Sequence, residues 1–349
     1  MAKIDEKRPE EQRKLQMTGG STYTLSLPKE WVTQNQLRKG SVVIISEEED
    51  GSLAINPSKR ERQEKRNEAL IRVSPNENPD AVMRKAISAY LVGYNILHIR
   101  AQGQQPFSVA LRNYLKRFAR NYLVGTEIVT SSPSELTLQI LLNYQELSVQ
   151  SALRRMAIIA ASMHKEAVQC LSNLDFATAK AVVETDQEVN RFSLYTVRLL
   201  KMAVANVRTV KEIGLSNQRE CIGYRLIAKS VERTADHATK IAENILALKA
   251  PVLPELLERI NNLSSLAISM FESSIEALFR HDYNLAERAI QKISQIYKLE
   301  KDAVISSHAV SIEEAPNVRL LIESIRRTAE YASDISEIVL NLNIETVLV

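Results

Sequence analysis

The strongest constraint on the fold is a helical sequence pattern that is repeated in the C-terminal part of the chain. From about residue 143 onward there are no strand signals, and the hydrophobic positions follow a helical period. Apolar or small residues alternate at spacings of three and four along one stripe: Leu153, Met156, Ala160, Met163, Ala167, Cys170 and Leu174. This spacing predicts an amphipathic helix with one buried face.

A second copy of the pattern follows the first. Adding 107 to the residue numbers of the first stripe gives a largely equivalent stripe from Ile260 to His281. The later part of the unit recurs at an offset of 94, where Arg233-Thr234-Ala235 matches Arg327-Thr328-Ala329. An acidic residue followed by an aromatic begins the next helix in both copies, at Asp175 and at Asp282. The chain therefore carries two copies of one helical unit, and we expect three helices in each copy.

The residues before the repeats divide into two smaller zones. Residues 10–58 contain short strand-like runs separated by turn signals, which predict small strands and hairpins. Residues 67–141 alternate strand and helix signals in the order βαβαββ, and the helix expected at about 107–122 is basic and amphipathic. The charged stretch at 58–67 is interpreted as a linker or a solvated helix. The predicted fold is mainly α, with tandem three-helix bundles at residues 143–249 and 251–345 after a small β domain and a small α/β domain.

Charge and hydropathy limit the function classes. The formal net charge is +3, too small for binding to nucleic acid or an anionic membrane by bulk attraction, so any nucleic-acid surface must be local. No run approaches the roughly 18 apolar residues of a membrane span, and the N-terminus has no apolar segment typical of a signal peptide. We therefore expect a cytoplasmic protein without membrane insertion.

An acidic motif in the first repeat is the sharpest chemical feature. Glu232 and Asp236 are four residues apart, so their carboxylates lie one turn apart on one face of a helix. The preceding helix carries two pairs at the same spacing, and an antiparallel neighbour could turn either pair towards the motif. An oxygen-rich site of this kind suits Mg²⁺, Mn²⁺ or iron better than zinc. The alternative is a solvated acidic face neutralised by Arg191 or Arg233. The candidate metal ligands are Glu232, Asp236, Asp186, Asn190, Glu184 and Glu188.

The second repeat lacks this motif. Arg326 stands at the position of Glu232, and with Glu330 it predicts an ordinary ion pair along the helix. The segment equivalent to the second acidic cluster, residues 291–295, contains no carboxylate. If the bundle binds metal, we therefore expect the first repeat to do so. The five histidines show no metalloenzyme spacing and no nucleotide-binding loop is present, so no catalytic set emerges and the sequence does not predict an enzyme.

The helix around the acidic motif, Val231 to Glu243, closely resembles the signature helix of PhoU-type phosphate-uptake regulators. The resemblance covers roughly residues 143–345. It implies two tandem three-helix bundles whose Glu-xxx-Asp carboxylates bind multinuclear metal clusters. It also implies a signalling role that couples a high-affinity phosphate transporter to gene expression without catalysis. The change to Arg326 in the second copy is a departure from the family pattern.

The N-terminal zone resembles a second family. The segments Gly19 to Trp31 and Leu37 to Val43 are similar to the AbrB/SpoVT/MazE swapped-hairpin domain, in which two chains interlock into one small β-barrel. The resemblance implies a homodimer and DNA binding, although some domains of this type only dimerise. Both resemblances together are typical of archaeal PhoU-like regulators. The available phosphate contacts are Arg13, Lys14, Lys29, Arg38 and Lys39. Because Glu10, Glu11 and Glu30 are interspersed among them, an ordinary solvated surface is the alternative.

Three functional hypotheses follow. The first is a dimeric transcriptional regulator of phosphate uptake that contacts DNA through its N-terminal domain and senses its state through the bundle. The second is an adaptor that does not bind DNA and acts on a phosphate transporter ATPase or a sensor kinase through protein contacts. The third is a metal-dependent hydrolase that uses Glu232 and Asp236, for which the sequence offers no nucleophile or base.

Overall fold

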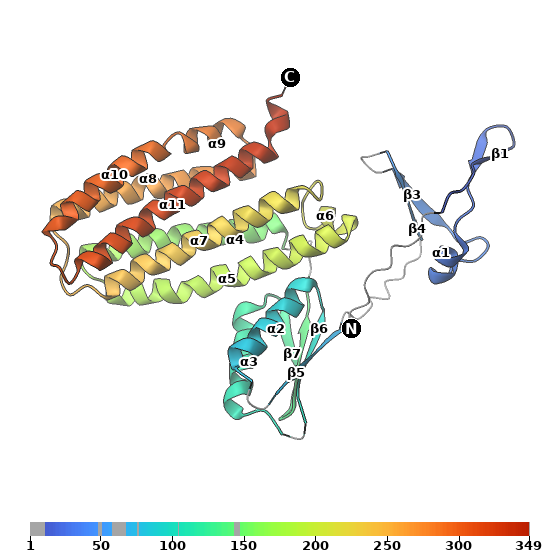
Figure 1. Ribbon diagram of the computed structural model, residues 1–349, viewed down its shortest axis with the longest axis horizontal. Coiled ribbons are helices and arrows are strands. Elements are labelled where there is room, and N and C mark those ends of the chain that lie inside the picture. The colour runs from blue at the N-terminus through green and yellow to red at the C-terminus, as the bar shows by residue number, and fades with distance from the viewer. Residues whose placement is uncertain are drawn as a thin grey trace. The chain divides into compact units, whose positions relative to one another are not determined.

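The computed structural model describes residues 11–47, 51–57, 68–74, 77–103, 105–142 and 147–348. The chain divides into two compact units, residues 1–65 and residues 66–349 (Figure 1). The charged stretch between the small β domain and the α/β domain, residues 58–67, lies outside the described residues. Within the described residues, no helix has the length and apolar character that crossing a bilayer requires.

The first unit consists of two hairpins and a short helix. Its elements are β1 (Gln16–Thr18), β2 (Thr22–Thr24), α1 (Lys29–Gln34), β3 (Val43–Glu47) and β4 (Leu53–Pro57). Strand β1 pairs with β2 and β3 with β4, both antiparallel. The first turn is made by Gly19 and Gly20, whose positive φ angles of 66° and 82° favour glycine. Among the described residues, the two strands of each hairpin pair only with each other, so the hairpins of a single chain do not form a closed barrel.

The second unit begins with the predicted α/β domain. Its elements are β5 (Glu68–Val73), α2 (Pro79–Val92), β6 (Ile96–Ala101), α3 (Val109–Tyr122), β7 (Thr126–Ser131) and β8 (Glu135–Ile140). The sheet order is β5-β6-β8-β7, with β5 and β6 parallel and the other pairs antiparallel. Alternate strand residues such as Ile71, Val73, Leu97 and Ile99 are buried and form one core with the apolar sides of α2 and α3. This architecture confirms the βαβαββ prediction.

The helical repeats complete the second unit. Repeat one contains α4 (Val149–Gln169), α5 (Phe176–Ala205), α6 (Val207–Glu212) and α7 (Glu220–Leu246). Repeat two contains α8 (Pro254–Arg280), α9 (Tyr283–Ile290), α10 (Ile293–Ser306) and α11 (Ala315–Leu342). The long helices of both repeats lie side by side, with α7 packed against α11 (Figure 1). Each copy thus has three main helical segments, but the middle one of repeat two is interrupted at Gln291 and Lys292.

The predicted helix starts and buried stripe are confirmed. The Asp175 carboxylate accepts a hydrogen bond from the Thr178 N–H at 3.0 Å, and the Asp282 carboxylate accepts one from the Leu285 N–H at 2.9 Å. Both aspartates therefore cap the N-terminus of the following helix. All seven positions of the first predicted stripe except Leu174 are buried in the helical core, and Leu174 packs against that core partly buried.

The α/β domain is fixed to repeat one by the buried side chain of Arg198 on α5. Its guanidinium donates to the backbone carbonyls of Tyr90, Tyr94 (3.0 Å) and Gly93 (3.2 Å), and to Asn95 Oδ1 at 2.9 Å. These carbonyls lie at the C-terminus of α2, where the helix dipole favours a positive charge. The buried charge of Arg198 is therefore balanced by oriented backbone groups across the domain boundary.

Candidate metal-binding site

The structure selects one of the two polar pairs on α5. Asp186 and Asn190 are half-buried, and the Asn190 side chain donates to Asp186 Oδ2 at 2.6 Å. Glu184 and Glu188, which have the same spacing, are exposed. Helix α5 packs along α7, the helix that carries Glu232 and Asp236. Of the two pairs, Asp186 and Asn190 are the half-buried one, so the candidate cluster consists of these two residues on α5 with Glu232 and Asp236 on α7, and a ligand role for Glu184 and Glu188 stays a prediction.

Glu232 is held by two neighbours. Its Oε2 accepts a hydrogen bond from Ser193 Oγ on α5 at 2.9 Å, and its Oε1 accepts one from Lys229 Nζ at 2.8 Å. Lys229 lies three residues before Glu232 on α7, a spacing that places both on one helix face. The cation that pairs with Glu232 is therefore Lys229 and not the predicted Arg191 or Arg233, although the spacing of Lys229 and Glu232 is visible in the sequence. Ser193 could not be found without the register between α5 and α7.

Electrostatic strain is concentrated at Asp186. Its pKa is raised to about 6, first because burial penalises the charged carboxylate and then because Asp236, Glu232 and Glu243 lie nearby. The pKa of Asp236 is also raised, by burial and by the charge of Glu232. In addition, Asp186 Oδ1 is buried and has no hydrogen-bond partner among the described residues. The carboxylates of α5 and α7 are thus held together with incomplete compensation by protein cations.

The donor set fits a hard divalent cation. Carboxylate and amide oxygens are ligands that Mg²⁺ and Mn²⁺ accept, and iron also binds carboxylates. Within the described residues, however, no group of three or more His, Cys, Asp or Glu side chains lies in the arrangement of a formed metal site. Metal binding at Glu232, Asp236, Asp186 and Asn190 therefore stays a prediction.

The equivalent position in repeat two is filled by a guanidinium. Arg326 Nε donates to Glu300 Oε1 at 2.8 Å, and a second nitrogen of the same group pairs with Glu330. The internal offsets place Arg326 at the position of Glu232 and Glu300 at that of Ser193. The predicted pairing of Arg326 with Glu330 is confirmed. Repeat two thus supplies a cation from its own chain where repeat one gathers carboxylates.

Two residues near the acidic motif face repeat two instead of the cluster. His237 Nε2 lies 3.4 Å from the Tyr331 hydroxyl oxygen, and burial lowers the pKa of His237 to about 4. The Arg233 guanidinium lies 5.8 Å from the centre of the Tyr331 ring. These contacts connect α7 to α11, so His237 does not join the oxygen donors.

The predicted DNA-binding residues are exposed in the first unit. Lys14 precedes β1, Lys29 begins α1, and Arg38 and Lys39 follow that helix. Arg13 pairs with Glu11. Their exposure is compatible with phosphate contacts and equally with a solvated surface, so DNA contact by these side chains stays a prediction.

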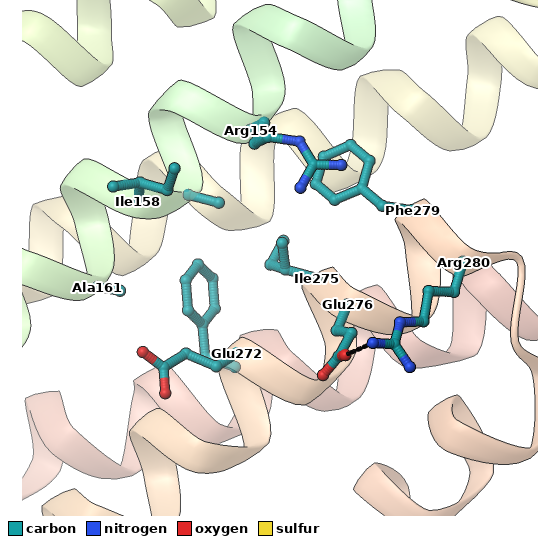
Figure 2. Close-up of a pocket in the computed structure, with 10 residues that line it drawn as sticks. Arg154, Ile158, Ala161, Glu272, Ile275, Glu276, Phe279 and Arg280 are labelled. Atoms are coloured by element: carbon teal, nitrogen blue, oxygen red, sulfur yellow. Dashed lines mark ion pairs between the residues drawn. The ribbon is translucent and has the colours of Figure 1, made fainter.

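A groove of about 440 Å³ lies between α4 and α8, apart from the acidic cluster (Figure 2). Its walls include Ile158, Phe271 and Ile275. The Arg154 guanidinium lies 4.0 Å from the centre of the Phe279 ring. Arg280 pairs with Glu276 at 2.7 Å, the contact drawn as a dashed line in Figure 2. The groove is therefore mainly apolar, with two of its charged side chains paired to each other.

Comparisons with known proteins match both parts of the chain. The PhoU domain model matches residues 153–245 and 260–339, and the model described as antidote-toxin recognition MazE, bacterial antitoxin, matches residues 16–63. The phosphate transport system regulatory protein PhoU from Streptococcus pneumoniae is 20% identical, with a TM-score of 0.50, over 58% of this chain and 96% of that chain. PhoU from Pseudomonas aeruginosa is 21% identical, with a TM-score of 0.51, over 56% of this chain and 96% of that chain. At these identities the solved structures establish a shared fold. A search of curated proteins gave no significant match.

Proposed function

Because its two C-terminal repeats place the chain in the PhoU family, and its N-terminus carries a MazE-type domain, we propose that it regulates phosphate uptake as a DNA-binding homodimer. PhoU from Streptococcus pneumoniae is described as a phosphate transport system regulatory protein, and we accordingly propose that this chain is a regulator and not an enzyme. The observation that carries the proposal is the combination of both domains on one chain. The PhoU repeats supply the link to phosphate, and the N-terminal hairpins supply a means of dimerisation and DNA contact.

Dimerisation is supported by the apolar surface of the first unit. Eight large apolar side chains around its strands are between 47 and 69% exposed: Leu15, Met17, Tyr23, Leu25, Val42, Ile44, Ile45 and Leu53. Isolated two-stranded hairpins are marginally stable in water, and a soluble monomer rarely exposes so many neighbouring apolar groups. Pairing the hairpins with those of a second chain would bury this surface and complete a barrel.

The acidic cluster of repeat one is the proposed input to the regulator. Asp186, Glu232 and Asp236 would hold a divalent metal ion, whose positive charge would offset their mutual repulsion and join α5 to α7. Arg326 leaves no comparable place in repeat two. Elemental analysis of the purified protein tests this part: we expect Mg, Mn or Fe in the wild type and its loss in the Glu232→Ala/Asp236→Ala variant. Equal metal content in both would contradict it.

DNA binding is tested by footprinting on the promoter region of phosphate-transport genes, at low salt and with divalent metal present. We expect protection by the wild-type chain and its loss when Lys29, Arg38 and Lys39 are changed together to Gln. A control variant that removes three exposed charges from the bundle, Lys298→Gln/Arg225→Gln/Arg319→Gln, should protect like the wild type. Absence of protection by the wild-type chain would refute the DNA-binding proposal.

A second candidate function is an adaptor that controls a transporter ATPase or a sensor kinase without binding DNA. The apolar groove between α4 and α8 favours it, because such a surface suits a protein partner. Pull-down with the purified ATPase and kinase, alongside the footprint, separates the two functions. Capture of either partner by a chain that gives no footprint would favour the adaptor.

A further inference from the structure

Helix α3 of the α/β domain has a polar side of one chemical kind. All of its charged residues are basic, and two exposed asparagines lie among them. These residues are Arg112, Asn113, Lys116, Arg117, Arg120 and Asn121. Each of the other α-helices in the described residues carries at least one carboxylate. Arginine, lysine and asparagine side chains are hydrogen-bond donors to phosphate oxygens. The outer side of α3 is therefore suited to a polyanion.

The basic side chains of α3 are available to a partner. Arg117 and Arg120 are exposed and Lys116 is partly exposed. None of these three forms an ion pair with another described residue. In repeat two, by contrast, the basic side chains of Arg326 and Arg327 are paired with carboxylates. The charge of α3 is therefore not neutralised within the described part of the chain.

The neighbouring helix extends the positive surface. Arg84 and Lys85 are exposed on α2, which packs beside α3. Two acidic residues lie near the start of α2. Glu77, just before the helix, pairs with Lys85 at 2.5 Å and so offsets that charge, and Asp80 accepts a hydrogen bond from the Tyr114 hydroxyl at 2.6 Å. The residues from Glu77 to the end of α2, together with α3, thus carry six basic side chains against two acidic ones.

The geometry of α3 suits a nucleic-acid backbone. Lys116 and Arg120 are one turn apart on one side of the helix, with Arg117 beside them, and four residues advance about 6 Å along the axis. Each strand of a duplex carries one phosphate for every 3.4 Å of helix axis, so side chains about 6 Å apart on α3 are close enough together to bind neighbouring phosphates of one backbone. The opposite side of α3, which includes Leu111, Leu115 and Phe118, is buried against the sheet. The helix consequently has no free apolar side to insert into a bilayer.

We propose that the α2–α3 surface of the α/β domain is a second DNA-contacting surface, in which Lys116, Arg117 and Arg120 bind backbone phosphates. This inference deepens the DNA-binding part of the proposed function and rests on it. Contacts to phosphates are independent of base sequence, so this surface adds affinity and salt dependence while base recognition is left to other residues.

The test measures binding of the full-length chain to a fluorescent duplex of mixed sequence by anisotropy, at a series of salt concentrations. It compares the wild type with Lys116→Gln/Arg117→Gln/Arg120→Gln. The matched control is the bundle variant Lys298→Gln/Arg225→Gln/Arg319→Gln, which removes one lysine and two arginines elsewhere. A third variant removes the N-terminal candidates Lys29, Arg38 and Lys39. Circular dichroism of each variant checks that the fold is retained.

We expect the α3 variant to bind at least about tenfold more weakly, with a slope of log affinity against log salt reduced by about 3, or about 1 for each lost phosphate contact. The control variant should match the wild type. Wild-type affinity and slope in the α3 variant would overturn the inference. If the α3 variant binds like the wild type and only the N-terminal variant loses binding, the proposed DNA-binding function stands and the inference about α3 falls. No binding by the wild type would overturn both.

A membrane is the competing polyanion, and a second arm of the test addresses it. The same variants are mixed with vesicles of phosphatidylserine and phosphatidylcholine and sedimented. Sedimentation of the wild type that is lost in the α3 variant, with DNA binding unchanged, would overturn the inference in favour of a membrane surface. Loss of DNA binding without vesicle binding supports it.

Discussion

Replacing Asp186 by asparagine should stabilise the metal-free protein. Its pKa of about 6 lies above the ordinary value of 3.8, and each pKa unit corresponds to about 1.4 kcal/mol. The difference between these two pKa values sets an upper limit of about 3 kcal/mol on how much the charged form of Asp186 destabilises the folded protein. Because the side chain is only half-buried, solvent screening reduces this figure, and we expect about 1–2 kcal/mol. Asparagine keeps the shape of the side chain and removes the charge.

The pH dependence of this effect follows from the sign of the shift. The folded state binds the proton of Asp186 more tightly than the unfolded state does. The contribution of Asp186 to stability is therefore most favourable below pH 3.8 and is lost as the pH rises through about 6. The advantage of Asp186→Asn should be complete at pH 7.5 and should shrink as the pH falls below 6.

Urea unfolding in the presence of a chelator, followed by far-UV circular dichroism, measures the effect. The matched control is Glu184→Gln, which removes a carboxylate from an exposed position two residues away and should change the free energy of unfolding by less than about 0.5 kcal/mol. Equal or lower stability of Asp186→Asn at pH 7.5 would show that neither burial nor the neighbouring carboxylates penalise the charged form of Asp186. The reasoning about the acidic cluster would then be refuted.

Three further predictions concern groups outside the acidic cluster. Arg198→Met should leave buried carbonyls unpaired and destabilise the contact between α2 and α5 by about 3 kcal/mol. Hydrogen exchange should then be faster for the backbone amides of α2, and an unchanged exchange rate would contradict this prediction. Burial lowers the pKa of His164 to about 4, so the contribution of the neutral imidazole to stability is lost as the pH falls from 6.5 to 4. The free energy of unfolding of His164→Gln should therefore depend less on pH in that range, and the same pH dependence in both proteins would refute this. Arg326→Met should leave Glu300 and Glu330 without their cation and lower the free energy of unfolding by about 2 kcal/mol, and a change under 0.5 kcal/mol in urea unfolding would argue against the proposed balance of charges.

Much of the fold could be predicted because it depends on local patterns. Alternating and helical spacings gave the elements of the α/β domain and the two repeats, and Asp175 and Asp282 marked helix starts because their side chains bond to the next turn. The interruption of the middle helix at Gln291 and Lys292 was not predicted, since neither residue is a strong helix breaker.

The acidic site could be predicted only in part. The pairs Glu184 with Glu188 and Asp186 with Asn190 have the same spacing, so spacing alone cannot tell which faces α7. The buried Val182 and Val189 settle the choice, because Asp186 lies one turn after Val182 on the same side of α5. The role of Arg198 could not be foreseen, because its acceptors are backbone carbonyls that lie about a hundred residues away in the chain.

The central claim, that the chain controls phosphate uptake by binding DNA, is tested most directly by its occupancy of chromosomal DNA in cells. Chromatin immunoprecipitation of the full-length chain should be carried out with abundant and with scarce phosphate, in cells that carry the wild type or the Lys29→Gln/Arg38→Gln/Lys39→Gln variant. We predict enrichment at promoters of phosphate-transport genes that changes with phosphate supply and is lost in the variant. No enrichment of the wild type at these promoters under either condition would contradict the claim.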